Sequence, residues 1–159
     1  MNGRRIRISQ LAVSSAILVF LLWAPFPSLT AQTKDMTTLT VRVTGARNTK
    51  GKIGVTLFQD AQGFPDDASK AIRQQSVEID PNTMSAQVTF TDLPQGTFAV
   101  SVLHDENGNG KMDKNFVGMP KEGYGASNNP KKKKRAPTFD EAKVSLNASE
   151  QTIEIMLIY

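Results

Sequence analysis

The chain reads Phe90-Thr91-Asp92-Leu93-Pro94-Gln95-Gly96-Thr97-Phe98-Ala99-Val100 between two segments in which apolar and polar residues alternate. Such alternation is typical of β-strands that bury one face in a core. Pro94 presets a turn angle and Gly96 permits a positive φ, so we expect the chain to reverse while Leu93 covers the core. The stretch therefore predicts two consecutive strands joined by a tight turn.

The same period of two recurs along the chain, and no segment shows sustained helical spacing. Seven strands are predicted from the alternating apolar residues, over 39–43, 53–57, 77–79, 84–90, 98–102, 142–146 and 153–159. Seven short strands favour an all-β, Ig-like or prealbumin-like β-sandwich. The turn after Phe90 agrees, because its pattern of leucine, proline, any residue, glycine, any residue and aromatic resembles that of transthyretin-like and carboxypeptidase-regulatory-like sandwiches.

The first 31 residues have the composition of a signal peptide. Basic residues at the start precede an apolar run over 11–24, which is short for a membrane span of about 20 residues. A small-residue region ending at Ala31 then suits signal peptidase. We expect cleavage after Ala31, with an uncleaved N-terminal anchor as the alternative. Residues 37–159 are then a single β-sandwich domain with a long loop over 104–137, exported to the periplasm or the extracellular space.

The charge balance excludes nucleic acid as the expected partner. The chain has 19 Lys and Arg residues against 15 Asp and Glu residues. Three of the basic residues, Arg4, Arg5 and Arg7, lie in the predicted signal peptide, so the remainder is nearly neutral. The absence of cysteine excludes disulfides and thiolate metal sites. Stability must come from an apolar core, and we expect a monomer.

A second informative stretch reads His104-Asp105-Glu106-Asn107-Gly108-Asn109-Gly110-Lys111-Met112-Asp113. It matches the start of an EF-hand calcium loop, which takes side-chain oxygens at positions one, three, five and nine, a glycine turn at six and a carbonyl at seven. The predicted calcium ligands are Asp105, Asn107, Asn109, Lys111 and Asp113. The alternative is that the two Asn-Gly pairs are turn dipeptides without a metal.

The match to the EF-hand ends at the twelfth position. A bidentate Glu belongs there, but this chain has Phe116. A carboxylate from another part of the chain must therefore complete the site, and the candidates are Glu122, Asp140 and Glu141.

Two alternative functions use other residues. In the first, His104 and Asp105 act with a metal-bound water in a metal-assisted hydrolase. In the second, the basic run from Lys131 to Arg135 binds an anionic envelope surface or another polyanion. A shallow recognition surface beside the ion is a further hypothesis, built from His104, Tyr124 and Asn128.

Three motifs in sequence resemble a bacterial family of exported proteins. They are the loop over 104–113, the segment Gly118-Met119-Pro120-Lys121-Glu122-Gly123-Tyr124-Gly125-Ala126-Ser127-Asn128, and Pro137-Thr138-Phe139-Asp140-Glu141-Ala142. The family is catalogued as the domain of unknown function 2141 family, and the resemblance covers residues 39–159. It implies a small exported sandwich with no established activity. We therefore expect a non-catalytic module with a calcium-stabilised loop.

Overall fold

Alternating apolar residues form β-strands throughout the part of the chain that the computed structural model describes, residues 35–131 and 135–159. The predicted signal peptide over 1–31 and the middle of the basic run, residues 132–134, lie outside the described residues. Residues 33–159 group as one compact unit. No helix within the described ranges is long and apolar enough to cross a membrane.

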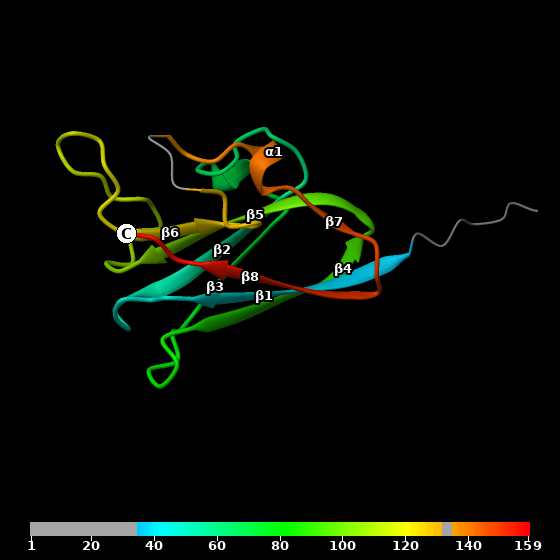
Figure 1. Ribbon diagram of the computed structural model, residues 1–159, viewed down its shortest axis with the longest axis horizontal. Helices are drawn as coiled ribbons and strands as arrows, with labels where there is room; N and C mark the ends of the chain where they lie inside the picture. The colour runs from blue at the N-terminus through cyan, green and yellow to red at the C-terminus, as the bar shows by residue number, and fades with distance from the viewer. Residues whose placement is uncertain (1–34, 132–134) are drawn as a thin grey trace, which may run out of the picture. The chain divides into compact units, whose positions relative to one another are not determined.

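The strands form two sheets (Figure 1). In the three-stranded sheet the order is β4 (Ala86–Pro94), β1 (Met36–Thr44) and β8 (Glu150–Met156). The central strand β1 pairs antiparallel with β4 and parallel with β8. In the five-stranded sheet the order is β3 (Arg73–Val77), β2 (Lys52–Phe58), β5 (Gly96–Asp105) and β6 (Gly123–Ala126), with β7 (Val144–Leu146) also paired to β5. All pairs in this second sheet are antiparallel.

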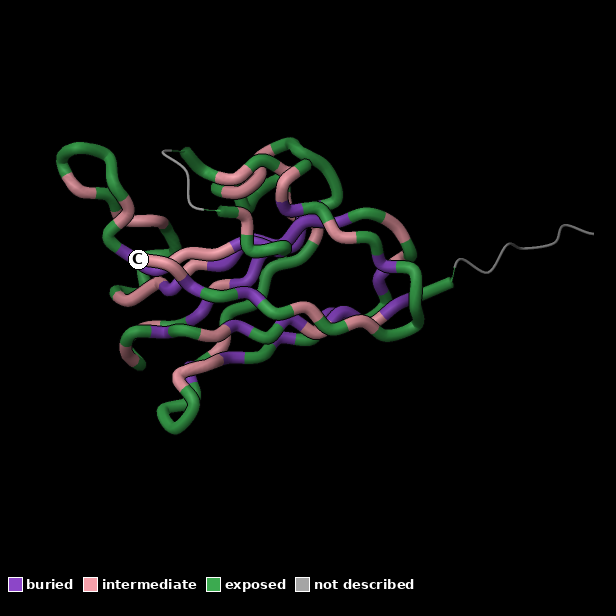
Figure 2. Tube along the Cα trace, viewed as in Figure 1, coloured by how far each residue is buried: buried purple, intermediate pink, exposed green. Residues whose placement is uncertain are grey.

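One apolar core is shared by both sheets. Leu39, Val41 and Val43 are buried on one face of β1, as their period of two predicts, and they belong to the same buried cluster as Val55 of β2 and Val100 of β5. Figure 2 shows the buried residues along the strands and mostly exposed residues in the loops. The described core lies entirely within the unit of residues 33–159. Residues 33–159 therefore contain a two-sheet core of their own.

The turn between Phe90 and Val100 carries the chain from one sheet to the other. β4 ends at Pro94 in the three-stranded sheet, and β5 begins at Gly96 in the five-stranded sheet. Leu93 is buried in the shared core. The predicted strands and the covering role of Leu93 are thus confirmed, and the turn also links the two sheets.

The prediction of seven strands is wrong, because the described residues contain eight. The additional strand is β6, which lies inside the predicted loop over 104–137 and pairs with β5. The strand predicted over 77–79 lies earlier, at Arg73–Val77. The nearly all-β character is confirmed.

Two short helical segments accompany the strands, η1 (Ala68–Lys70) and α1 (Phe139–Ala142). The second replaces the start of the strand predicted over 142–146. Its cause is a capping box, in which the Thr138 hydroxyl accepts the N–H of Glu141 and the Glu141 carboxylate accepts the N–H of Thr138. The strand β7 then begins after this turn.

Candidate functional site

The predicted metal loop is held between two paired strands. β5 ends at Asp105 and β6 begins at Gly123, and the last residue pair of their ladder is His104 with Gly123. Because the ladder fixes both ends, the loop over 106–122 leaves and re-enters the sheet at neighbouring points. The sheet therefore positions the first predicted ligand, Asp105, at the rim of the fold.

The Asp105 carboxylate organises the first turn of the loop. Its Oδ1 accepts the backbone N–H groups of Gly108 at 2.8 Å and Asn109 at 3.1 Å, and its Oδ2 accepts that of Gly110 at 2.7 Å. Gly108 and Gly110 have φ angles of +75° and +74°, which glycine adopts without steric cost. The backbone thus wraps around one carboxylate.

Asp113 closes the loop from its other side. Its Oδ2 accepts the side-chain amide of Asn107 at 2.7 Å, and its Oδ1 accepts that of Asn109 at 3.1 Å. The Asn107 and Asn109 oxygens each accept the backbone N–H two residues further on, as in Asx turns. Four of the predicted ligands are therefore brought together, by contacts that turn dipeptides also make. Lys111, the carbonyl donor of the prediction, lies between them and its side chain is exposed.

Glu122 fastens the base of this loop. Its carboxylate is almost fully buried, with Oε1 accepting the N–H of Glu106 and Oε2 the N–H of Asp113, each at 3.0 Å. Of the three carboxylates predicted to complete the site, Glu122 is the one that reaches the loop.

Asp140 and Glu141 are engaged elsewhere. They lie on α1, where Asp140 pairs with Lys143 at 3.0 Å and Glu141 pairs with Arg135 at 2.8 Å. Ala142 of the same helix packs on Ala99 of β5, which is about 20 Å along the strand from Asp105 at the usual rise per residue. The structure does not bring these two carboxylates to the loop.

The candidate calcium ligands of the loop are oxygen atoms, and few of the side chains that supply them carry a negative charge. Within the described residues no group of three or more His, Cys, Asp or Glu side chains is placed to hold a metal. The loop instead combines the carboxylates of Asp105 and Asp113 with the amides of Asn107 and Asn109. Amide, carboxylate and carbonyl oxygens suit a hard cation such as calcium, and few charges imply weak binding.

The sequence reasoning missed Arg47, which braces both ends of the loop. Its guanidinium pairs with Glu106 at 2.6 Å and donates to the carbonyl of Lys121 at 3.0 Å. It also lies over the Tyr159 ring, 4.5 Å from the centroid. Arg47 and Glu106 are 59 residues apart, so only the tertiary fold reveals the pair.

Glu106 is stabilised in its charged form. Burial raises the pKa of this carboxyl, but hydrogen bonds from Asn48 and Arg47 outweigh burial, so the pKa lies below its ordinary value of 4.5. A lowered pKa means that the charged carboxylate contributes its full stability above the ordinary value. That contribution is lost as the pH falls through the lowered value.

Glu106→Gln is therefore expected to lower the free energy of unfolding by about 1 kcal/mol at neutral pH. Because the wild-type carboxylate loses its advantage when protonated, the difference between the two proteins should shrink below about pH 4. Urea unfolding of both proteins from neutral to acidic pH measures this. A difference that stays constant throughout would contradict the role assigned to Glu106.

His104 is a packed core residue. It is fully buried, with Nδ1 2.6 Å from the Tyr159 hydroxyl and Nε2 2.9 Å from the carbonyl oxygen of Lys50. Both ring nitrogens are thus occupied. Successive strand residues face opposite sides of a sheet, so His104 points away from Asp105. The geometry leaves His104 no free nitrogen for a metal or a substrate.

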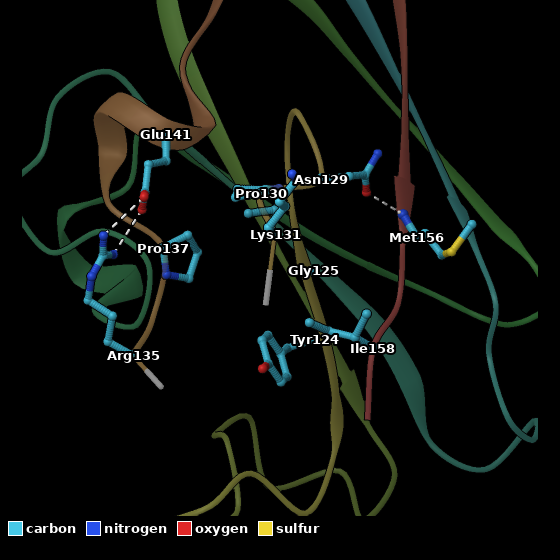
Figure 3. A pocket seen from close by; sticks show the side chains of 11 residues that line it. Tyr124, Gly125, Asn129, Pro130, Lys131, Arg135, Pro137, Glu141, Met156 and Ile158 are labelled. Carbon is cyan, nitrogen blue, oxygen red and sulfur yellow. Dashed lines mark hydrogen bonds and ion pairs between the residues drawn. The ribbon is translucent and has the colours of Figure 1, made fainter. Parts of the chain in front are cut away.

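Tyr124 and Asn128 do not join His104 in one surface. Tyr124 lines a pocket of about 270 Å³ whose wall includes Arg135 and Pro137 (Figure 3). Asn128 lies beyond the end of β6, where its amide donates to the carbonyl of Lys143 at 2.7 Å. The predicted recognition surface is therefore divided between the core, a pocket wall and a turn.

A family model matches most of the described fold. The model described as "Uncharacterized protein conserved in bacteria (DUF2141)" matches residues 41–154, which include most of both sheets and the whole loop. No curated protein and no solved structure gives a significant match to the chain.

Proposed function

The chain belongs to DUF2141, a family of uncharacterised proteins conserved in bacteria, and we propose that it is an exported, non-catalytic and monomeric module in which the loop over 105–113 binds calcium. We place its two sheets in the Ig-like sandwich class and its site of action in the periplasm or outside the cell.

The observation that carries the calcium proposal is that Asn109 links the two aspartates, which lie eight positions apart in sequence. Its backbone N–H donates to Asp105 Oδ1 at 3.1 Å and its side-chain amide donates to Asp113 Oδ1 at 3.1 Å, while the Asn107 amide donates to Asp113 Oδ2 at 2.7 Å. A cation at this place would replace the amide donors as the partner of the Asp113 carboxylate, and the asparagine oxygens would add to its coordination.

The expected affinity fits the proposed location. Two neutral amides and two carboxylates form a set of low charge, and extracellular calcium modules work with dissociation constants of about 10⁻⁴–10⁻³ M. Glu122 supports such a site, because its carboxylate accepts the backbone N–H groups of Glu106 and Asp113 and so holds both ends of the loop in place. Calcium would thus stabilise a loop that the protein has already shaped.

The hydrolase alternative has less support. A general base must reach the proton that it removes, and the two ring nitrogens of His104 contact Tyr159 and Lys50 inside the core. The polyanion alternative stays a prediction. At the ends of the basic run, Lys131 is exposed and Arg135 pairs with Glu141.

Calcium titration of residues 33–159 tests the proposal. We expect binding heat and a gain in unfolding free energy of about 1.4 kcal/mol at tenfold the dissociation constant, which raises the melting temperature by several degrees. Asp105→Ala should abolish both effects.

Asp80→Ala is the matched control, because the Asp80 carboxylate, like that of Asp105, accepts a backbone N–H of the turn that follows it, here from Asn82 at 2.8 Å. This variant loses a similar turn contact but should keep the full response to calcium. A parent protein that shows neither heat nor a shift in melting temperature would refute calcium binding.

A further inference from the structure

The loop that begins with the proposed calcium site ends in an apolar projection, the tip segment, residues 114–120. Phe116 is fully exposed, and Val117 and Met119 are 65% and 54% exposed. Elsewhere in the described chain only Met36 and Met156 are large apolar residues with comparable exposure. In Figure 1 this yellow segment extends beyond the sheets, and Figure 2 colours most of it as exposed.

The tip segment is a built turn with its own hydrogen bonds. A bridge between Lys114 and Pro120 closes its base. The Asn115 side-chain oxygen accepts the N–H of Val117 at 3.0 Å and that of Met119 at 2.9 Å, and the Asn115 N–H donates to the carbonyl of Met119 at 2.8 Å. Because the polar groups of the turn are satisfied inside it, the apolar side chains are held outward. Exposed apolar clusters of this kind mark interaction sites.

The charge around the tip segment is positive. Lys111, Lys114 and Lys121 are exposed at or beside its base, and none of them forms an ion pair with another described residue. The neighbouring acidic side chains have partners within the loop, since the half-buried Asp113 accepts the two asparagine amides and Glu122 is buried under the loop. The tip segment therefore combines exposed apolar side chains with three exposed lysines at or beside its base.

The size of the apex decides which partner suits it. A stable protein interface needs about 800 Å² on each side, which a seven-residue segment does not provide. Insertion into a bilayer interface requires only that a few apolar side chains reach the acyl boundary while cations meet the headgroups. We propose that the tip segment docks on a lipid bilayer that carries anionic headgroups, with Phe116, Val117 and Met119 inserted and the three lysines at the headgroups.

The proposal is independent of calcium binding, so its test is run with a chelator present. Trp23 is the one tryptophan of the sequence, so the fragment over 33–159 has none, and Phe116→Trp supplies a single probe at the apex. We expect its emission to shift to the blue with phosphatidylglycerol vesicles and to stay unshifted with phosphatidylcholine vesicles. Added salt should weaken binding, because the attraction to the headgroups is screened.

Cosedimentation of the fragment with the same vesicles measures the contribution of each part. Phe116→Ser should lower the partition coefficient by about tenfold to a hundredfold, since a full aromatic side chain is no longer buried. Lys114→Gln and Lys121→Gln should each lower it by about fivefold. Met156→Ser removes an exposed apolar residue far from the tip in sequence and should bind as the parent does.

Phe116 has no packing to lose, so its variants should keep the parent melting temperature. Absence of binding to anionic vesicles would overturn the proposal. So would equal binding by the parent and Phe116→Ser, or an unshifted tryptophan at position 116 in protein that sediments with vesicles.

Discussion

Gly51→Ala is expected to lower the free energy of unfolding by about 2–5 kcal/mol and to weaken calcium binding. Gly51 has a φ of +65°, and a methyl group there would meet the backbone carbonyl of Asp105 and lie 2.8 Å from the Cα of Glu106. The left-handed conformation costs an alanine about 1–2 kcal/mol, and displacing packed backbone costs about 1–3 kcal/mol more. The displaced backbone is the entry to the proposed calcium loop, so stability and affinity should fall together.

Gly108→Ala is the matched control for this substitution. Its φ of +75° carries the same conformational cost, but no atom lies within 4 Å of the added methyl group. We expect a loss of only about 1–2 kcal/mol. Denaturant unfolding of both variants without calcium separates the steric effect from the conformational one. Equal losses in the two variants would contradict the close contact between Gly51 and the loop entry.

His104→Ala is expected to lower the free energy of unfolding by about 3–5 kcal/mol, an effect as large as that of Gly51→Ala. It removes a fully buried ring and leaves a cavity in the fold. It also leaves the Lys50 carbonyl without the hydrogen bond from Nε2 and the Tyr159 hydroxyl without Nδ1. A structural role for His104 therefore predicts a large drop in the midpoint of denaturant unfolding.

Glu78→Ala provides the comparison on the surface. Glu78 pairs with Lys52 at 3.0 Å, but both side chains are more than half exposed, so we expect a loss below about 1 kcal/mol. If His104→Ala unfolds at the same denaturant concentration as the parent, the packing role assigned to His104 is wrong, and the hydrolase alternative gains support.

The strands were predictable where apolar residues alternate over several positions. Leu39, Val41 and Val43 face the core as their spacing requires. β6 was not predicted, because Gly123 and Gly125 interrupt any alternation of apolar and polar residues there. The strand is defined by its hydrogen-bonded pairing with β5. A Cβ at Gly123 would lie 2.5 Å from the Tyr159 ring, so these glycines allow the C-terminal segment to pass closely.

The helix α1 could have been predicted from the sequence. Thr138 and Glu141 have the spacing of a capping box, which is a known start signal. The prediction of a strand there followed the apolar residues Ala142, Val144 and Leu146, of which only the last two lie in β7. The local capping signal prevailed over the apparent period of two.

The candidate site was predictable within the loop and not beyond it. Spacing alone brought Asp105, Asn107, Asn109 and Asp113 together, because a short loop restricts where its own side chains lie. The partners that brace the loop come from distant parts of the chain: Arg47 lies 59 residues before Glu106, and Tyr159 lies 55 residues after His104. Contacts at such separation depend on which strands lie side by side, and the alternation of apolar residues does not specify the strand order.

A crystal structure of residues 33–159 grown in millimolar calcium tests the central claim most directly. We predict an ion bound at about 2.3–2.6 Å by oxygens of Asp105, Asn107, Asn109 and Asp113 and by the Lys111 carbonyl. Calcium binding by this loop would be contradicted by a calcium-saturated crystal in which the Asp105 and Asp113 carboxylates face apart and no ion lies between them.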